Sequence, residues 1–236
     1  TIKNLEFDIV FSSYNFSSKN NLAKLQNHNF SIREINMLSK SLLNNTNKIF
    51  QNYKNINQTD DDAIKKLNKA NINIKYKNLN DKIKALKMII NKIREYGTPQ
   101  FCRAARLSFL TKDILNSFIN ENKEYKNEID LYMTNIKTIS SDIQNDMYKS
   151  KINNSETKFM NKYGHLRPDT YNICSKRYLD IKNLVMKSSK PLNHANKVIK
   201  LSNKFKENFT ISLKDNKLSF TTEKFFKILN ETIKKR

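Results

Sequence analysis

Glycine and proline are scarce in this chain, which has two Gly and three Pro among 236 residues. A fold with many β-strands uses Gly and Pro as well as Asn and Asp in its frequent turns, so the scarcity of Gly and Pro disfavours that class. Tryptophan is missing, but 14 Phe, 10 Tyr and a hydrophobic fraction of 38% are too apolar for a disordered chain. We therefore predict a folded, all-α protein of many helices.

Long hydrophobic runs are also missing. No stretch approaches the roughly 18 uncharged apolar residues that a membrane helix needs, and residues 1–4 do not resemble the start of a signal peptide. We expect a cytoplasmic protein without a membrane partner.

The chain has only two cysteines, Cys102 and Cys174. A cytoplasmic protein keeps such thiols reduced and packs them as small apolar groups, which is what we predict. Together with His165 they lack the closely spaced ligand pairs of a zinc site, so no metal site is predicted.

Acidic residues are few relative to basic ones: 22 Asp and Glu stand against 44 Lys and Arg, a net charge of +22. Such a charge suggests a nucleic-acid partner. However, about one residue in seven is Asn and Lys outnumbers Arg about five to one, the bias expected of an AT-rich genome. The basic residues are also scattered and not gathered into one block. We therefore do not expect nucleic acid as the main partner.

Helical spacing of apolar residues gives the expected elements. Residues 1–30 are predicted as an extended segment following a preceding domain, with a strand at residues 5–11, and residues 31–236 as the helical domain. Ser31 and Glu34 form a capping box that begins the first helix. The expected helices cover residues 31–55, 59–72, 80–96, 98–115, 125–147, 155–163, 178–186, 193–205 and 222–236, with a small hairpin at 211–220. The last helix has no stop signal, so we expect it to be truncated.

Two short stretches, residues 96–106 and 162–178, depart from the Lys and Asn bias. They contain both glycines, two of the three prolines and four of the seven arginines. An Arg where Lys would be mutationally easier suggests a need for the planar, bidentate guanidinium.

The second stretch carries a family resemblance. Tyr163-Gly164-His165-Leu166-Arg167-Pro168, then Thr170, Tyr171 and Ile173, followed by Ser175, Arg177 and Tyr178, resembles the "YGHLRPGTYDI…S.RY" signature of phosphoenolpyruvate synthase/pyruvate phosphate dikinase-like proteins. The stretch from Gly97-Thr98-Pro99 to Leu110 is similar to the region that precedes this signature. Residues 7–12 resemble the family's exit from its nucleotide-binding domain. Asp169 stands where the family usually has Gly.

The resemblance implies a central helical domain of an ATP-dependent phosphotransferase, which could bind the phosphoryl acceptor. It implies an ATP-grasp domain before this segment, a phosphohistidine domain after it, and ATP and Mg bound by the full-length protein. No cofactor is expected in this segment, because two glycines cannot build a Gly-rich phosphate loop. We expect the segment alone not to be catalytic, and the phosphoryl acceptor is unknown.

The candidate site residues come from the two stretches. His165 and Arg167 could face one anionic group, with Arg103 and Arg106, three residues apart on one helix, as a second anion site. The remaining candidates are Arg177 as an anion ligand and, as structural motif residues, Gly97, Pro99, Gly164, Pro168 and Tyr171. The alternatives are hydrogen bonds to backbone carbonyls in a tight loop for His165, an ion pair with an acidic residue for Arg167, and interhelical salt bridges for Arg103 and Arg106.

Two other functions stay open beside the phosphotransferase reading. One is a nucleic-acid-binding helical module, suggested by the net charge and the many Tyr and Phe. The other is a purely structural spacer that holds two catalytic domains apart.

Overall fold

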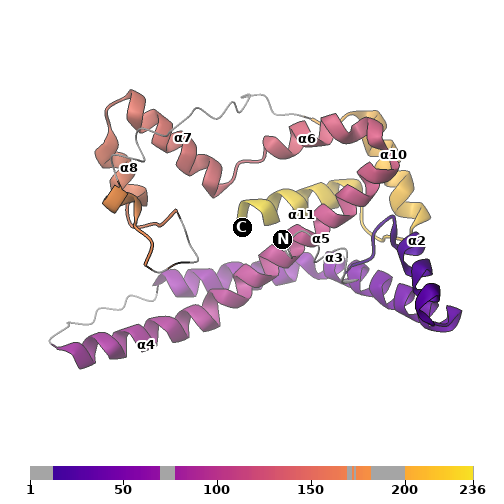
Figure 1. Cartoon of the computed structure of the whole chain (residues 1–236), viewed down its shortest axis with the longest axis horizontal. Coiled ribbons are helices and arrows are strands. Elements are labelled where there is room, and N and C mark those ends of the chain that lie inside the picture. The colour runs from indigo at the N-terminus through magenta and orange to yellow at the C-terminus, as the bar shows by residue number, and fades with distance from the viewer. Residues whose placement is uncertain (1–12, 70–77, 169–171, 173, 182–199, 236) are drawn as a thin grey trace. The chain divides into compact units, whose positions relative to one another are not determined.

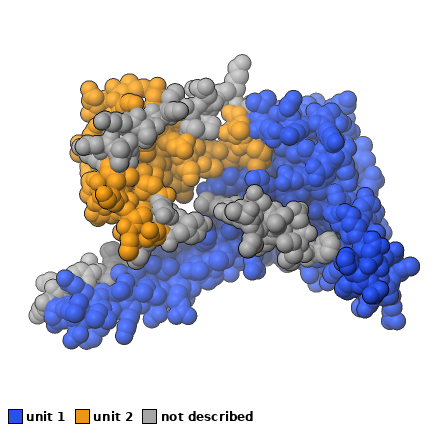
Figure 2. Space-filling model, viewed as in Figure 1, with its two compact units in different colours: residues 1–131, 200–236 blue, residues 132–199 orange. Residues whose placement is uncertain are grey.

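The computed structural model describes residues 13–69, 78–168, 172, 174–181 and 200–235. Every element in these ranges is an α-helix or a 3-10 helix, which confirms the predicted all-α class. The chain forms two compact units, shown in Figure 2: unit 1 is Thr1–Leu131 with Lys200–Arg236, and unit 2 is Tyr132–Ile199.

Unit 1 opens with a short helix, α2 (Ser18–Ala23), and a 3-10 turn, η1 (Lys24–His28). The second half of the predicted extended segment is therefore helical. Leu22 is fully buried, and its burial anchors this short helix in the unit. The strand predicted at residues 5–11 lies outside the described residues.

The long helix α3 (Ile32–Lys69) begins as predicted. The Ser31 N–H donates to Glu34 Oε2 at 2.9 Å and the Glu34 N–H donates to Ser31 Oγ at 3.3 Å, which is the expected capping box. The predicted break near residue 57 is wrong, because the helix continues without interruption. Thr59 does not cap a new helix but donates its hydroxyl to the Asn55 carbonyl at 2.9 Å within the same one.

Helices α4 (Leu79–Tyr96) and α5 (Thr98–Glu121) meet at Gly97. The stop and restart predicted at Gly97 is confirmed, but Gly97 has φ −122° and not the left-handed conformation that a glycine at the end of a helix commonly adopts. The need for glycine is spatial: a Cβ there would lie 3.0 Å from the Ile93 carbonyl oxygen and 3.3 Å from Leu67 Cδ2. The cap is Gly97 itself, so Thr98 is already helical and Pro99 lies in the first turn.

The hairpin predicted at 211–220 is wrong, because residues up to 215 belong to α10 (Asn203–Asp215). Ile211 and Leu213 alternate like a strand, but Phe205, Phe209 and Leu213 repeat every four residues and are all buried. Ser202 caps this helix by accepting the Phe205 N–H at 3.2 Å. The four-residue repeat, which is typical of a helix, therefore determines the structure of this segment.

The core of unit 1 is an aromatic cluster. Phe118 of α5 packs edge to face against Phe205 and Phe209 of α10, with ring centroids 5.4 and 5.0 Å apart. Helix α11 (Thr222–Lys235) adds Phe225 and lies along α5 (Figure 1). Phe118, Phe205, Phe209 and Phe225 are fully buried.

After α5 the chain continues through η2 (Lys123–Tyr125) and α6 (Lys126–Thr134). The single helix predicted for 125–147 is interrupted, and α7 (Ile139–Ile152) starts anew. Thr138 and Ser141 exchange reciprocal capping bonds of 3.1 and 2.8 Å, a start signal inside the apolar pattern.

Unit 2 contains α7, α8 (Glu156–Tyr163) and the 3-10 turn η3 (Tyr178–Ile181). Phe159 and Tyr163 form its small buried core, against which Ile143, Met147 and Tyr178 pack. Of the helix predicted at 178–186, the first four residues form η3 and the rest lie outside the described residues, as do residues 193–199 of the helix predicted at 193–205.

Candidate functional site

Arg103, on α5, points to α3. Its Nε donates to both carboxylate oxygens of Asp60, at 2.9 and 3.1 Å, and Nη2 makes a further short bond to Oδ1. The Asp60 side chain is 13% exposed, and its hydrogen bonds raise the pKa of the guanidinium. Arg103 therefore forms the interhelical salt bridge that was predicted as the alternative to an anion site.

Arg106 is exposed, and the structure gives it no ion pair with another described residue. It lies two turns beyond the start of α5 at Thr98, too far along the helix for the backbone N–H groups of the first turn to share an anion with it. The two arginines do not converge on one site, because Arg103 is occupied by Asp60.

In unit 2 backbone hydrogen bonds join residues near the two ends of the family-like stretch. The Tyr178 N–H donates to the Leu166 carbonyl at 2.9 Å, and the Leu179 N–H donates to the Gly164 carbonyl at 3.1 Å. These bonds tie the two ends of the stretch together. Arg167 Nε donates to the Ser175 carbonyl at 2.9 Å, a bond across the same loop.

His165 is exposed, as is Pro168, while Arg167 is half-buried. Arg177 pairs with Asp180 three residues on, with Nη2 2.8 Å from Oδ1 and Nε 3.0 Å from Oδ2. This pairing lowers the pKa of Asp180 to about 2. The motif residue Tyr171 lies outside the described residues.

Gly164 ends α8, as predicted. The lack of space for a side chain explains why this residue is glycine. A Cβ there would lie 2.4 Å from the Met160 carbonyl oxygen, although the backbone is in the ordinary right-handed region. The glycine lets the loop leave the helix in close contact with its last turn.

One residue that sequence reasoning missed holds this loop to α7. Asp146 Oδ2 accepts from Lys162 Nζ and from Tyr163 Oη, each at 2.8 Å, and these bonds lower the pKa of Asp146. Tyr163 is the first residue of the family-like stretch, but no sequence signal indicates a partner 17 residues earlier.

The five candidate ligands thus belong to different units: Arg103 and Arg106 to unit 1, and His165, Arg167 and Arg177 to unit 2. Three of the four arginines donate to groups of their own unit. Both cysteines are free and exposed, so the prediction that they pack as apolar groups is wrong.

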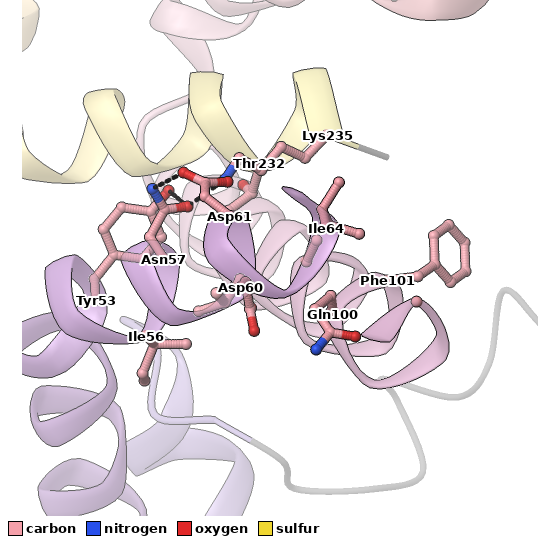
Figure 3. A pocket seen from close by; sticks show the side chains of 13 residues that line it. Tyr53, Ile56, Asn57, Asp60, Asp61, Ile64, Gln100, Phe101, Thr232 and Lys235 are labelled. Atoms are coloured by element: carbon pink, nitrogen blue, oxygen red, sulfur yellow. Dashed lines mark hydrogen bonds and ion pairs between the residues drawn. The ribbon is translucent and has the colours of Figure 1, made fainter. Parts of the chain in front are cut away.

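Unit 1 contains a pocket of about 290 Å³ between α3, α5 and α11 (Figure 3). Apolar walls come from Ile56, Ile64 and Leu107. At one side Lys235 reaches from α11 to α3, where it donates to Asn57 Oδ1 at 2.6 Å and pairs with Asp61. The charged groups at the pocket are therefore largely neutralised by each other.

Two polar side chains of the pocket are deeply placed. Tyr53 donates to Glu231 Oε2 at 2.7 Å, and burial together with this carboxylate raises the tyrosine pKa. Gln100 is 8% exposed, and its Oε1 has no hydrogen-bond partner among the residues that the structure describes. An unsatisfied buried acceptor of this kind is rare in folded proteins.

Within the described ranges there is no group of three or more His, Cys, Asp or Glu side chains placed to bind a metal ion. None of the helices described combines the length and the apolar character that crossing a membrane requires. No family model matches the chain, and neither a curated protein nor a solved structure is significantly similar to it.

Proposed function

We propose that this chain is the central helical domain of an ATP-dependent phosphotransferase that resembles phosphoenolpyruvate synthase and pyruvate phosphate dikinase. In that enzyme the domain acts as a structural module. The likeness of residues 163–178 and 97–110 to that family supports the proposal. The all-α fold agrees with the helical region that the resemblance implies.

One observation favours a structural module over an acceptor-binding one. Arg103, Arg167 and Arg177 already donate to Asp60, Ser175 and Asp180 of their own units. A guanidinium that grips a phosphate or carboxylate has to offer its paired donors to that ligand. The Arg103 bond instead joins α5 to α3, the Arg167 bond spans one loop, and the Arg177 pair is local, which favours the spacer role.

In this proposal the phosphate chemistry belongs to the flanking domains. An ATP-grasp domain would hold ATP and Mg, a phosphohistidine domain would carry the phosphoryl group, and the helical domain would separate them. The segment itself contributes long helices, above all α3 and α5, which have 38 and 24 residues.

The test uses Arg167→Lys in the full-length enzyme. Lysine keeps the charge but cannot keep the guanidinium bond to the Ser175 carbonyl in the same geometry. We expect a lower melting temperature and an unchanged turnover per folded molecule. Arg33→Lys, an exposed arginine of α3, is the matched control and should change neither quantity.

An unchanged melting temperature with a tenfold or larger loss of transfer to the acceptor would overturn the structural role. Robust ATP turnover by these 236 residues alone would overturn the whole proposal. If the chain instead bound nucleic acid at physiological salt, with an affinity falling steeply as salt rises, the nucleic-acid reading would replace it.

A further inference from the structure

Helix α4 carries an apolar stripe that the described parts of the chain leave open. Its members follow one another at intervals of four, three, four and three residues: Leu79, Ile83, Leu86, Ile90 and Ile93. Their side chains are between 42% and 71% exposed. Such spacing is typical of the core-facing side of a helix.

The helix is turned so that another face packs inward. Ala85 is the one buried residue recorded for α4, and Ile89, Lys92 and Tyr96, which follow it on the same side, are half-buried. The end of this face meets α3, where Lys66 Nζ lies 6.0 Å from the centre of the Tyr96 ring. At about 100° per residue, this face is centred about 110° away from the stripe.

The stripe has the form of a coiled-coil seam. Its spacing corresponds to the a and d positions of two heptads, with Ile83 and Ile90 at a. The five residues cover about 80° of the helix circumference, narrower than the face of at least 100° that a surface helix normally buries. A membrane-surface helix needs a broad apolar face, so this geometry favours a partner helix over a lipid surface.

The charges along the stripe are all of one sign. Lys87 and Arg94 occupy e positions and Lys82 a g position, and all three are exposed. The acidic residues of α4, Asp81 and Glu95, lie away from the stripe. In a pair of identical helices these basic flanks would face each other and repel, which disfavours a second copy of this chain.

We propose that the α4 stripe is the docking site for an amphipathic helix of a partner protein, with apolar residues in its a and d positions and Asp or Glu in the flanking e and g positions. The stripe runs about 21 Å along the axis, roughly four helical turns. This is a small contact, so the complex is a transient one. The inference is independent of the phosphotransferase proposal.

The probe is a 21-residue helical peptide with Leu and Ile at a and d and Glu at every e and g position, titrated against the intact chain. A matched peptide has Lys at e and g. We expect the Glu peptide to bind at least about tenfold more tightly, because each basic flank then meets an opposite charge and not a like one. Charge reversal with Lys87→Glu and Arg94→Glu should invert this preference.

Leu86→Ser with Ile90→Ser should weaken binding of the Glu peptide at least about tenfold, because two apolar contacts are lost. Ile211→Ser, an equally exposed residue of α10, is the control and should leave binding unchanged. Since Leu86 and Ile90 are exposed, the melting temperature should stay the same in both variants.

Three results would overturn the proposal. Equal affinity for the Glu and Lys peptides would indicate unspecific apolar adhesion. Binding to phosphatidylserine vesicles that is lost in the Leu86→Ser and Ile90→Ser variant, without binding of the Glu peptide, would identify a lipid surface. Dimerisation of the chain that the same variant abolishes would identify a second copy as the occupant.

Discussion

At the scale of the residue, Gln100 is a buried acceptor whose Oε1 lacks a partner among the described residues. Gln100→Met keeps the length of the side chain and removes the desolvated amide. We expect the free energy of unfolding to rise by about 1 to 2 kcal/mol, the typical cost of an unsatisfied buried polar group. Urea unfolding followed by circular dichroism measures this difference.

Gln58→Met, an exposed position of α3, is the control and should stay within about 0.5 kcal/mol of the parent protein. A loss of stability in Gln100→Met would mean that the amide is satisfied in solution, for instance by a molecule in the adjoining pocket.

The pair of Arg103 and Asp60 gives a second prediction. Arg103→Met leaves the Asp60 carboxylate, which is mostly buried, without its counter-charge. We expect a loss of about 2 kcal/mol in unfolding free energy, below the cost for a fully buried pair because Arg103 is 43% exposed. Adding Asp60→Leu should restore most of the loss, and a double-mutant cycle measures the coupling. Additive effects of the two changes would show that the pair contributes nothing.

Some of these side-chain roles could be predicted from the sequence and others could not. The alternative of an interhelical salt bridge is confirmed for Arg103 and not for Arg106. Arg167, for which an acidic partner was the alternative, donates instead to the Ser175 carbonyl. Asp60 and Asp146 could not be found as partners, because their distances along the chain, 43 and 17 residues, depend on how helices pack and carry no local signal.

At the scale of the element, the close approach at the end of α8 makes Gly164 sensitive to substitution. In Gly164→Ala the new Cβ would lie 2.4 Å from the Met160 carbonyl oxygen, so backbone has to move. We expect unit 2 to lose about 2 kcal/mol or more. Gly97→Ala, where the closest atom is at 3.0 Å, should cost clearly less. Hydrogen exchange of the α7 and α8 amides measures the first change, and equal losses at both glycines would contradict the spatial argument.

The carboxylates of unit 2 give a pH prediction. Lys162 and Tyr163 lower the pKa of Asp146, and Arg177 lowers that of Asp180 to about 2. A depressed folded-state pKa stabilises the fold above the unfolded value of about 4 and loses that contribution as the pH falls toward 2. Unit 2 should therefore weaken between about pH 4 and pH 2.

Asp146→Asn with Asp180→Asn should flatten this acid transition, measured by tyrosine fluorescence, whereas Asp142→Asn on the same helix α7 should leave it in place. A transition that is the same in all three proteins would show that other groups cause it.

Capping and turn signals in the local sequence explain which elements could be predicted. Ser31 with Glu34 and the Gly97 junction each contain their own boundary signal, and both were located correctly. The start of α7 at Thr138 has its signal too, but the continuing apolar spacing hides it. The unbroken course of α3 past residue 57 and the helix at 203–215 depend on tertiary packing against α5 and the phenylalanine cluster, which a local pattern does not contain.

At the scale of the whole molecule, unit 1 is built from two separate parts of the chain. Helix α11 packs against α5, and Phe205 and Phe209 of α10 enclose Phe118, so residues after 200 complete a core begun before 131. Neither glycine nor proline marks residues 131–132 or 199–200, and the boundaries therefore could not be read from composition.

The two chain segments that enter and leave unit 2 are held together within unit 1. The Ser202 N–H donates to Glu128 Oε1 at 2.5 Å, and the Ser202 hydroxyl donates to Oε2 at 3.1 Å. The ends of the insertion thus lie close enough for a short connection. Because the phenylalanine core lies wholly outside residues 132–199, unit 1 contains what it needs to fold without them.

We therefore predict that replacing residues 132–199 by a linker of about eight Gly and Ser residues leaves unit 1 folded. The variant should unfold cooperatively in urea, with far-ultraviolet circular dichroism matching its remaining helices and with slow exchange of the α5 and α11 amides. Phe118→Ala in this shortened chain should cost about 3 to 5 kcal/mol, as it would in the intact chain, because the same buried rings surround it. If the transition were not cooperative, or if Phe118→Ala left the unfolding free energy of the shortened chain unchanged, unit 2 would be required to assemble the core of unit 1.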